Sequence, residues 1–325
     1  MIYMKASTKN TKSIYVIYDR NVESFVLEQF PDYPRLAITA DEEHKTIDTV
    51  LGICRWLLEQ GADRKAICYA VGGGVTTDMV GFAASIYKRG VKYVNYPTTL
   101  LSQVDAGIGG KTGVNLDAYK NMIGVTRFPA DTRIFPEVLK TLPEREFRSG
   151  AAELLKTFII ENKSGNYEKA VQLLSAEKID FKALEPLIKA AGQIKEKIVE
   201  KDPFEAGLRR VLNLGHTYAH AIEWYQHTHE TQTPLSHGEA VAVGIIKAAK
   251  ISEALGVAKA GLAAKLAEDF KACHLPVDMP CPEAEIQEAM KKDKKAEGGA
   301  INFVLIKKIG KVIIQEINDL HKYSE

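Results

Sequence analysis

The sequence predicts a two-domain protein, in which an α/β domain with a parallel, doubly wound sheet precedes a mostly α-helical domain. Three observations lead to this prediction. The first third of the 325 residues alternates short apolar runs with stretches of helical periodicity, as strands joined by crossover helices do. A run of three glycines directly follows one of the predicted strands. Long helical stretches dominate from about residue 144 onward.

The strands of the first domain are predicted from short apolar runs that are bounded by turn residues or helices. They are expected at 14–18, 36–39, 66–71 and 91–96. Helices are expected at 44–60, where Gly61 follows, and from the glycine run to about residue 88. This alternation favours a parallel sheet with helices on its faces.

The second domain is predicted from apolar residues at helical spacing. Helices are expected at 144–162, 184–200, 207–227, 237–255 and 262–273, and a hairpin of two strands at 300–306 and 311–317, around Gly310. Pro136 and Pro143 interrupt the pattern between the two domains. We therefore predict domains at 1–142 and 143–325.

The composition excludes several classes of partner. With 43 basic and 42 acidic residues the net charge is +1, so no field of one sign would attract nucleic acid or an anionic membrane. There is no run of 18 apolar residues and no signal-peptide pattern at the N-terminus. The four cysteines form no CxxC pair, which together with these absences favours a reducing, cytoplasmic location.

The sequence GGGVTTD, between a predicted strand and a predicted helix, is typical of a loop that binds phosphate groups. Gly72, Gly73 and Gly74 would let the backbone approach an anion at the positive end of the helix. We expect Thr76 and Thr77 to cap this helix and Asp78 to lie in its first turn. The spacing differs from GxGxxG, and the run alone is equally compatible with a tight structural turn.

Histidines and one carboxylate suggest a metal site. His216 and His220 lie four residues apart in VLNLGHTYAHAIE and would share one face of a helix. His237 follows in LSHGE, and Glu153 in GAAELLK offers a carboxylate. One carboxylate and two imidazoles form the kind of three-ligand set that catalytic zinc uses, with positions left open for substrate. Two histidines at this spacing often arise by chance, so the pair His216 and His220 alone is more typical of an ordinary structural role than of metal binding.

Several phrases in order along the chain resemble the 3-dehydroquinate synthase family. They are GGGVTTDMVGFAASIYKRGVKYVNYPTTLL, SQVDAGIGGKTGVNL, KNMIG, TLPEREF, GAAELLK, LRRVLNLGHTYAHAIE and LSHGEAVAVG. The resemblance covers nearly the whole chain. It implies a Rossmann-like NAD-binding α/β domain followed by a helical metal-binding domain, with the active site between them.

The resemblance also assigns roles to individual residues. It implies that Glu153, His216 and His237 bind Zn²⁺ or Co²⁺, whereas His220 contacts the substrate and helps to relay a proton. The residues that match NAD contacts are Asp19, Asn21, Glu42, Lys45, Gly73, Gly74, Val75, Asp78, Thr98, Thr99, Lys120, Thr141, Leu142 and Glu146. The residues that match substrate contacts are Asp105, Lys111, Asn121, Lys156, Lys195, Arg209, Asn213 and Lys294, with Lys295 as a rival for the last. Arg89 matches an arginine that reaches the active site of the neighbouring subunit in a homodimer.

The reaction that the resemblance implies is a step of the shikimate pathway towards aromatic amino acids. It converts 3-deoxy-arabino-heptulosonate 7-phosphate to 3-dehydroquinate and phosphate by transient oxidation with NAD, phosphate elimination, re-reduction and an intramolecular aldol step. The expected catalytic residues are His220, Asn213, Lys111, Lys156 and Asp105. Because net charge is nearly zero, local lysines and arginines must hold the anionic substrate. The alternatives are a cyclase of the deoxy-inosose or valiolone type, a glycerol-dehydrogenase-like oxidoreductase and a non-catalytic paralogue.

Overall fold

A computed structural model describes residues 13–117, 119–229, 231–286, 290 and 301–317. The chain divides into two compact units, Met1–Lys140 and Thr141–Glu325. The predicted boundary after residue 142 lies two residues beyond this division. No helix among the described residues is long and apolar enough to cross a membrane.

The first unit is built on a parallel five-stranded sheet with the order β2-β1-β3-β4-β7. Its strands are β1 (Ile14–Asp19), β2 (Arg35–Ile38), β3 (Ile67–Gly72), β4 (Lys92–Pro97) and the short β7 (Asp131–Thr132). The predicted strands are therefore present, each within a residue or so of its expected bounds. The sequence patterns did not indicate β7.

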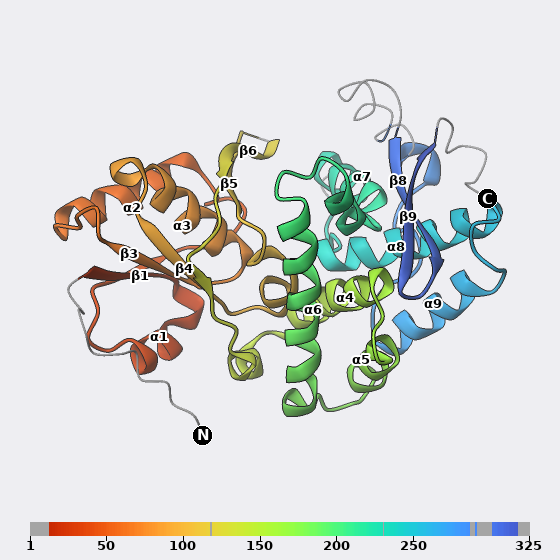
Figure 1. The fold of residues 1–325 in the computed structure, drawn as a ribbon. Coiled ribbons are helices and arrows are strands. Elements are labelled where there is room, and N and C mark those ends of the chain that lie inside the picture. The colour runs from red at the N-terminus through yellow and green to blue at the C-terminus, as the bar shows by residue number, and fades with distance from the viewer. Residues whose placement is uncertain (1–12, 118, 230, 287–289, 291–300, 318–325) are drawn as a thin grey trace. The chain divides into compact units, whose positions relative to one another are not determined.

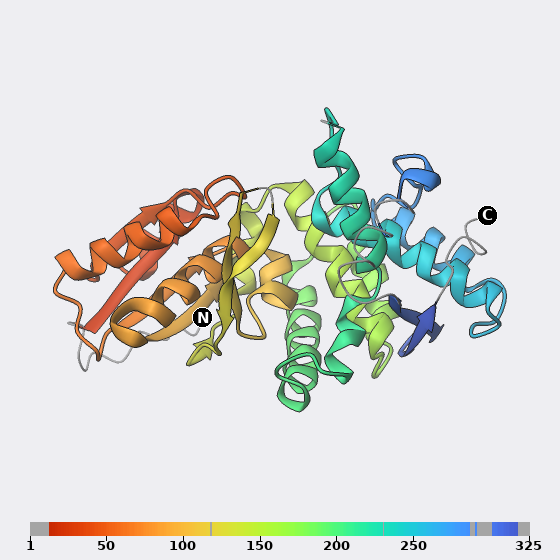
Figure 2. The ribbon, with the colours of Figure 1, turned by 90° about the horizontal axis from the view of Figure 1, so that it is seen from above.

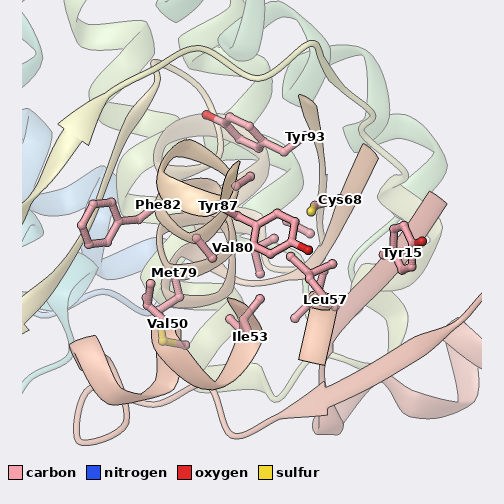
Figure 3. Close-up of a cluster of buried hydrophobic side chains, with 14 of the residues drawn as sticks. Tyr15, Val50, Ile53, Leu57, Cys68, Met79, Val80, Phe82, Tyr87 and Tyr93 are labelled. Atoms are coloured by element: carbon pink, nitrogen blue, oxygen red, sulfur yellow. The ribbon is translucent and has the colours of Figure 1, made fainter. Parts of the chain in front are cut away.

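Helices cover both faces of this sheet (Figure 1). They are α1 (Glu23–Gln29) on one face, and α2 (Ile47–Glu59) and α3 (Gly74–Ile86) on the other. Alternate residues of a strand point to opposite faces, so Tyr15 and Ile17 pack under α2 and α3, whereas Val16 and Tyr18 pack with α1. Figure 3 shows the larger of these two cores, with side chains of α2 against those of α3.

A hairpin follows β4 in the first unit and precedes β7. It consists of β5 (Lys111–Leu116) and β6 (Tyr119–Thr126), which pair antiparallel. Val114 of β5 is fully buried in the core beneath α3, so the hairpin is anchored on that helix. A π-helical turn at Ser102–Ala106 precedes it, and a 3-10 helix at Pro136–Thr141 closes the unit.

The second unit is mostly helical. Its helices are α4 (Glu144–Ile160), α5 (Asn166–Leu174), α6 (Phe181–Lys201), α7 (His216–Thr228), α8 (His237–Ala254) and α9 (Leu262–Ala272). Helix α8 is buried along most of its length and packs against α4, α7 and α9. The predicted hairpin, β8 (Ile301–Lys308) and β9 (Lys311–Ile317), lies against these helices in both views (Figures 1 and 2).

One predicted helix is wrong. The stretch 207–227 is not continuous, because a 3-10 helix at Leu208–Asn213 ends before α7 begins at His216. Gly215 separates them with a φ of 80°, which is the left-handed region. A Cβ at this position would also lie 2.9 Å from the carbonyl oxygen of Val241 in α8. The break therefore depends on a glycine that fits closely against a neighbouring helix.

Candidate functional site

In the first unit the predicted nucleotide contacts gather at the carboxyl ends of β1 and β3. The strand order reverses between these two strands, and ligands of open α/β sheets bind at such a switch point. Asp19 ends β1, and its side chain accepts a hydrogen bond from the backbone N–H of Asn21. Gly72 ends β3, and its carbonyl oxygen accepts from the N–H of Thr98 after β4. The sheet thus brings Asp19, the glycine run and Thr98 to one edge.

The glycine run is required by close packing. A Cβ on Gly72 would lie 2.2 Å from the Thr76 hydroxyl oxygen, and one on Gly74 would lie 2.9 Å from the Cβ of Ala106. Helix α3 begins at Gly74 and has no side-chain cap, so the expectation that Thr76 and Thr77 cap it is wrong. The Thr77 hydroxyl instead donates to the carbonyl oxygen of Gly74. With no capping side chain, the first N–H groups of α3, including that of Val75, remain directed toward the site where an anion would bind.

Lys45 joins residues that were predicted to contact different ligands. Its side chain is buried, and its Nζ lies 2.7 Å from Asp78 Oδ2 and 2.6 Å from Asn121 Oδ1. The Asn121 backbone N–H donates to Asn115, whose amide donates to Glu42. Asp78 lies beyond the first turn of α3, contrary to expectation. A single network therefore connects three predicted NAD contacts with Asn121, a predicted substrate contact.

The other predicted residues of the first unit lie in or beside loops. Asp105 belongs to the π-helical turn, and Thr99 bonds to Ser102 at the start of that turn. Lys111 begins β5 and is exposed. Lys120 is exposed in β6. Arg89 is exposed after α3 with a φ of 64°.

In the second unit, three elements bring together a carboxylate and two imidazoles. Glu153 of α4, His216 of α7 and His237 of α8 each place one ligand atom within 4.8 Å of the others. Glu153 Oε1 lies 3.7 Å from His216 Nε2 and 3.5 Å from His237 Nε2. The carboxylate is fully buried, and its Oε1 faces the Nε2 atoms of both imidazoles. A divalent cation would satisfy this buried acceptor, so the residues fit a zinc or cobalt site.

Neighbouring groups orient both imidazoles. His216 Nδ1 lies 3.2 Å from the carbonyl oxygen of Leu214, and His237 Nδ1 lies 3.4 Å from Glu223 Oε1. Each Nδ1 can therefore donate outward while Nε2 faces Glu153. Metal-binding histidines generally donate their second nitrogen to a carbonyl or carboxylate in this way. The sequence analysis did not identify Glu223, although it lies seven residues after His216, which places both on one helical face.

Burial and neighbouring charges shift the pKa values of His216, His237 and Glu153 in different ways. Burial, together with nearby Lys156, lowers the pKa of His216 to about 3. Burial also disfavours charge on His237, but hydrogen bonds to Glu153 and Glu223 outweigh it and raise its pKa to about 10. Burial alone would raise the pKa of Glu153, yet Lys156 and both imidazoles hold it well below its ordinary value. At neutral pH and without metal, His216 is therefore a neutral imidazole, whereas His237 is protonated on both ring nitrogens.

One buried cation contacts this set, and two more lie in elements that pack against α4. Lys156 lies one helical turn after Glu153, with Nζ 2.6 Å from Glu153 Oε2 and 2.8 Å from the carbonyl oxygen of Leu212. Lys195 of α6 and Arg209 of the 3-10 helix are also buried. Buried lysine and arginine are rare unless they serve a charged partner, and α4, α6 and the 3-10 helix pack against one another. The second unit therefore concentrates positive charge close to the carboxylate.

Two further predicted catalytic residues lie near the triad. The ring of His220 packs edge-on against that of His216 with centroids 5.5 Å apart, but His220 is exposed and not part of the three-atom cluster. Asn213 is exposed and donates to Glu205 Oε1 over 2.8 Å. The loop before it is held by Asp202, whose carboxylate accepts from three backbone N–H groups, including that of Arg209. The sequence analysis did not identify Asp202 as the residue that holds the backbone of Arg209 in place.

Of the remaining predicted contacts, three lie within the described residues and the last pair of candidates does not. Thr141 is the last residue of the 3-10 helix, Leu142 lies between that helix and α4, and Glu146 is exposed in the first turn of α4. Lys294 and its rival Lys295 lie outside the described residues.

Comparisons with known proteins match nearly the whole chain. Residues 35–149 match the family described as 3-dehydroquinate synthase N-terminal, and residues 150–296 match 3-dehydroquinate synthase C-terminal. The 3-dehydroquinate synthase of Pyrococcus abyssi is 41% identical over 306 residues, which cover 94% of this chain and 86% of that protein.

Solved structures of two other cyclases have the same fold. A 2-deoxy-scyllo-inosose synthase with carbaglucose-6-phosphate, NAD⁺ and Co²⁺ is 26% identical, with a TM-score of 0.83 over 94% of this chain and 88% of that one. The 2-epi-5-epi-valiolone synthase of Streptomyces hygroscopicus, with NAD⁺ and Zn²⁺, is 28% identical, with a TM-score of 0.81 over 96% and 89%. These matches and the geometry agree, and the chain belongs to the 3-dehydroquinate synthase family.

Proposed function

We propose that this chain converts 3-deoxy-arabino-heptulosonate 7-phosphate to 3-dehydroquinate and phosphate, with bound NAD and one divalent metal ion. The observation that carries the proposal is the buried carboxylate with two imidazoles and an adjacent buried lysine. The identity to dehydroquinate synthases, 41% for the Pyrococcus abyssi protein, supports the choice of reaction.

The residues of the second unit would hold the metal and the substrate. Glu153, His216 and His237 would bind Zn²⁺ or Co²⁺ through the three atoms that already face one another. A bound divalent cation would acidify a coordinated hydroxyl, and bound NAD would accept a hydride and later return it. His220 would move a proton, since its exposed ring lies beside that of His216.

The charged residues would bind and orient the anionic substrate. Lys156, Lys195 and Arg209 are buried cations, and the family resemblance assigns all three to the substrate. Lys111, Asn121, Asp105 and Asn213 would add contacts from loops and strand ends, and Lys294 is proposed on family resemblance alone. Fixed positions for these charges lower the cost of reorganisation during the reaction.

The carboxyl edge of the parallel sheet would bind NAD. The N-terminus of α3 offers N–H groups for the pyrophosphate after Gly73, and Asp19 ends the adjacent strand β1. The contacts proposed from Thr141, Leu142 and Glu146 would come from the start of the second unit.

Another sugar-phosphate cyclase is the second candidate, because both solved cyclases share this fold. Their identities of 26% and 28% are well below the 41% to a dehydroquinate synthase. Lys111, Asn121 and Arg209, which the resemblance to dehydroquinate synthases assigns to the substrate, are all present. This favours the dehydroquinate reaction.

We also propose a homodimer in the cytoplasm. Arg89 is exposed on a left-handed turn and would reach the neighbouring subunit, as the resemblance implies. The four cysteines are free thiols, which suits a reducing compartment.

The test is release of phosphate from the heptulosonate phosphate with NAD, with and without a chelator, while the NADH absorbance is followed. We expect phosphate release that needs metal, without accumulation of NADH. His237→Asn should abolish it, whereas His229→Asn, at an exposed histidine outside the triad, should retain it. Accumulation of NADH without phosphate would instead indicate a dehydrogenase, and neither signal would indicate another substrate or a non-catalytic paralogue.

A further inference from the structure

Helices α4 and α8 touch through their backbones at Ser149 and Gly238. The N–H of Gly238 donates to the Ser149 hydroxyl oxygen over 3.0 Å. A Cβ added to Gly238 would lie 1.9 Å from the carbonyl oxygen of Ser149, so only glycine permits this approach. Both residues are buried. The two helices are therefore closely packed at this point, and Arg145 of α4 also pairs with Glu239 of α8 over 2.8 Å.

This contact lies beside two of the proposed metal ligands. Ser149 precedes Glu153 by four residues, so both side chains lie on the same face of α4. Gly238 directly follows His237, the first residue of α8. The hydrogen bond therefore fixes the end of α8 that carries His237, one helical turn from the carboxylate that lies 3.5 Å from its Nε2.

The N–H of Gly238 has few other ways to be satisfied. The first N–H groups of a helix have no partner within that helix. This one is buried and donates to the Ser149 hydroxyl, while Ser236 and Glu239 form a capping box for other groups of the same helix end. Without the hydroxyl, the buried N–H would lose its acceptor, and the first turn of α8 would gain by moving away from α4 toward water. His237 would move with it.

We propose that Ser149 is a positioning residue of the metal site, which holds His237 at its distance from Glu153 before any metal binds. The inference rests on the proposed role of Glu153 and His237 as metal ligands. It predicts that loss of the Ser149 hydroxyl weakens metal binding by more than it weakens the fold.

Ser252 provides a matched control. Its hydroxyl is likewise buried in α8 and accepts a backbone N–H, that of Ile306, over 2.9 Å, but it is not next to a proposed ligand. Ser149→Ala and Ser252→Ala should lower Tm by similar amounts, about a few degrees each. By titration with Co²⁺, followed by its visible absorption, Ser149→Ala should bind about tenfold or more weakly with an altered spectrum, as for other groups that support metal ligands. Ser252→Ala should bind as the unaltered protein does.

The outcomes separate the two proposals. If the unaltered protein binds no Co²⁺, the metal site itself is wrong. If it binds Co²⁺ and Ser149→Ala binds equally well with the same spectrum, the positioning role is wrong. Equal weakening in both variants would also overturn it, since it would reflect general destabilisation.

Hydrogen exchange of the unaltered protein gives a second test that needs no variant to fold. In the metal-free protein the amide of Gly238 should exchange slowly, although it lies in the first turn of a helix, where amides ordinarily exchange fast. Fast exchange that slows only after Co²⁺ is added would overturn the inference, because the metal would then be ordering the turn.

Discussion

Metal binding should release one proton, and that proton should come from His237. The pKa of His237 is raised to about 10, because Glu153 and Glu223 outweigh the effect of burial. The pKa of His216 is lowered to about 3 by burial and Lys156, and that of Glu153 lies well below its ordinary value. At neutral pH, His216 is therefore neutral and Glu153 is ionised. Only His237 must lose a proton before its Nε2 can bind a cation.

The release of one proton sets how strongly metal affinity depends on pH. Between the pKa of His216 and that of His237, metal affinity should rise tenfold for each pH unit, which corresponds to about 1.4 kcal/mol. From pH 6 to pH 8 the dissociation constant should fall about 100-fold. The sign follows because protons compete with the metal for His237, so higher pH favours binding.

Calorimetric titration of the metal-free protein with Zn²⁺ or Co²⁺, in buffers of different protonation enthalpy, measures the released protons directly. Glu223→Gln removes one of the carboxylates that raise the pKa of His237, so fewer protons should be released at the alkaline end of the range. Glu285→Gln is the control, because Glu285 pairs with His229 over 3.2 Å outside the metal set. A count of two would mean that His216 is also charged, and a count of zero that His237 is neutral; either result would refute the reasoning.

Three further predictions concern stability and binding. Leu57→Ala should lower the free energy of unfolding by about 2–5 kcal/mol in urea titrations, since Leu57 is fully buried. Leu58→Ala is the control: this side chain is 64% exposed, and its loss should change the free energy of unfolding by less than about 0.5 kcal/mol. Similar losses in both variants would contradict the assignment of Leu57 to the core. Gly52→Ala, in open space inside α2, should raise that free energy by about 0.5–1 kcal/mol. Gly244→Ala should lower it, because the Cβ would lie 2.0 Å from a carbonyl oxygen of the adjacent chain segment, and a stabilised variant would refute that packing. Lys45→Met should weaken NAD binding and raise the KM for substrate together, each about tenfold or more, because Asp78 and Asn121 both lose the amine that donates to them. Fluorescence titration and steady-state kinetics measure the two effects, and an effect on one ligand alone would contradict a shared network.

Much of the fold follows from local patterns. The strands of the parallel sheet are short apolar runs, and the glycine run marks where β3 turns into α3. Such signals depend on residues close in sequence. The elements that were not predicted are β7, α1, α5 and the β5–β6 hairpin, of which β6 is exposed along most of its length. Tertiary packing rather than periodicity defines them.

The break at Gly215 shows where local patterns fail. The residues on both sides have helical propensity, so periodicity predicts one continuous helix. The close approach of α8 decides otherwise, because the carbonyl oxygen of Gly215 lies where a side chain at Gly244 would be. No sequence window that contains only one of these residues carries that information.

By itself, the sequence determined the chemistry available to this protein: a carboxylate, nearby histidines, a lysine on the same helical face and a glycine-rich turn. Its family motifs also indicated which of these act together. Only the tertiary structure decided their geometry. His216 and His220 are neighbours on one helix, yet it is His237, from another helix, whose Nε2 lies 3.5 Å from Glu153. The reason is physical: distances within a helix are set by its repeat, whereas distances between helices are set by packing, here by a glycine at the point where α8 meets α4.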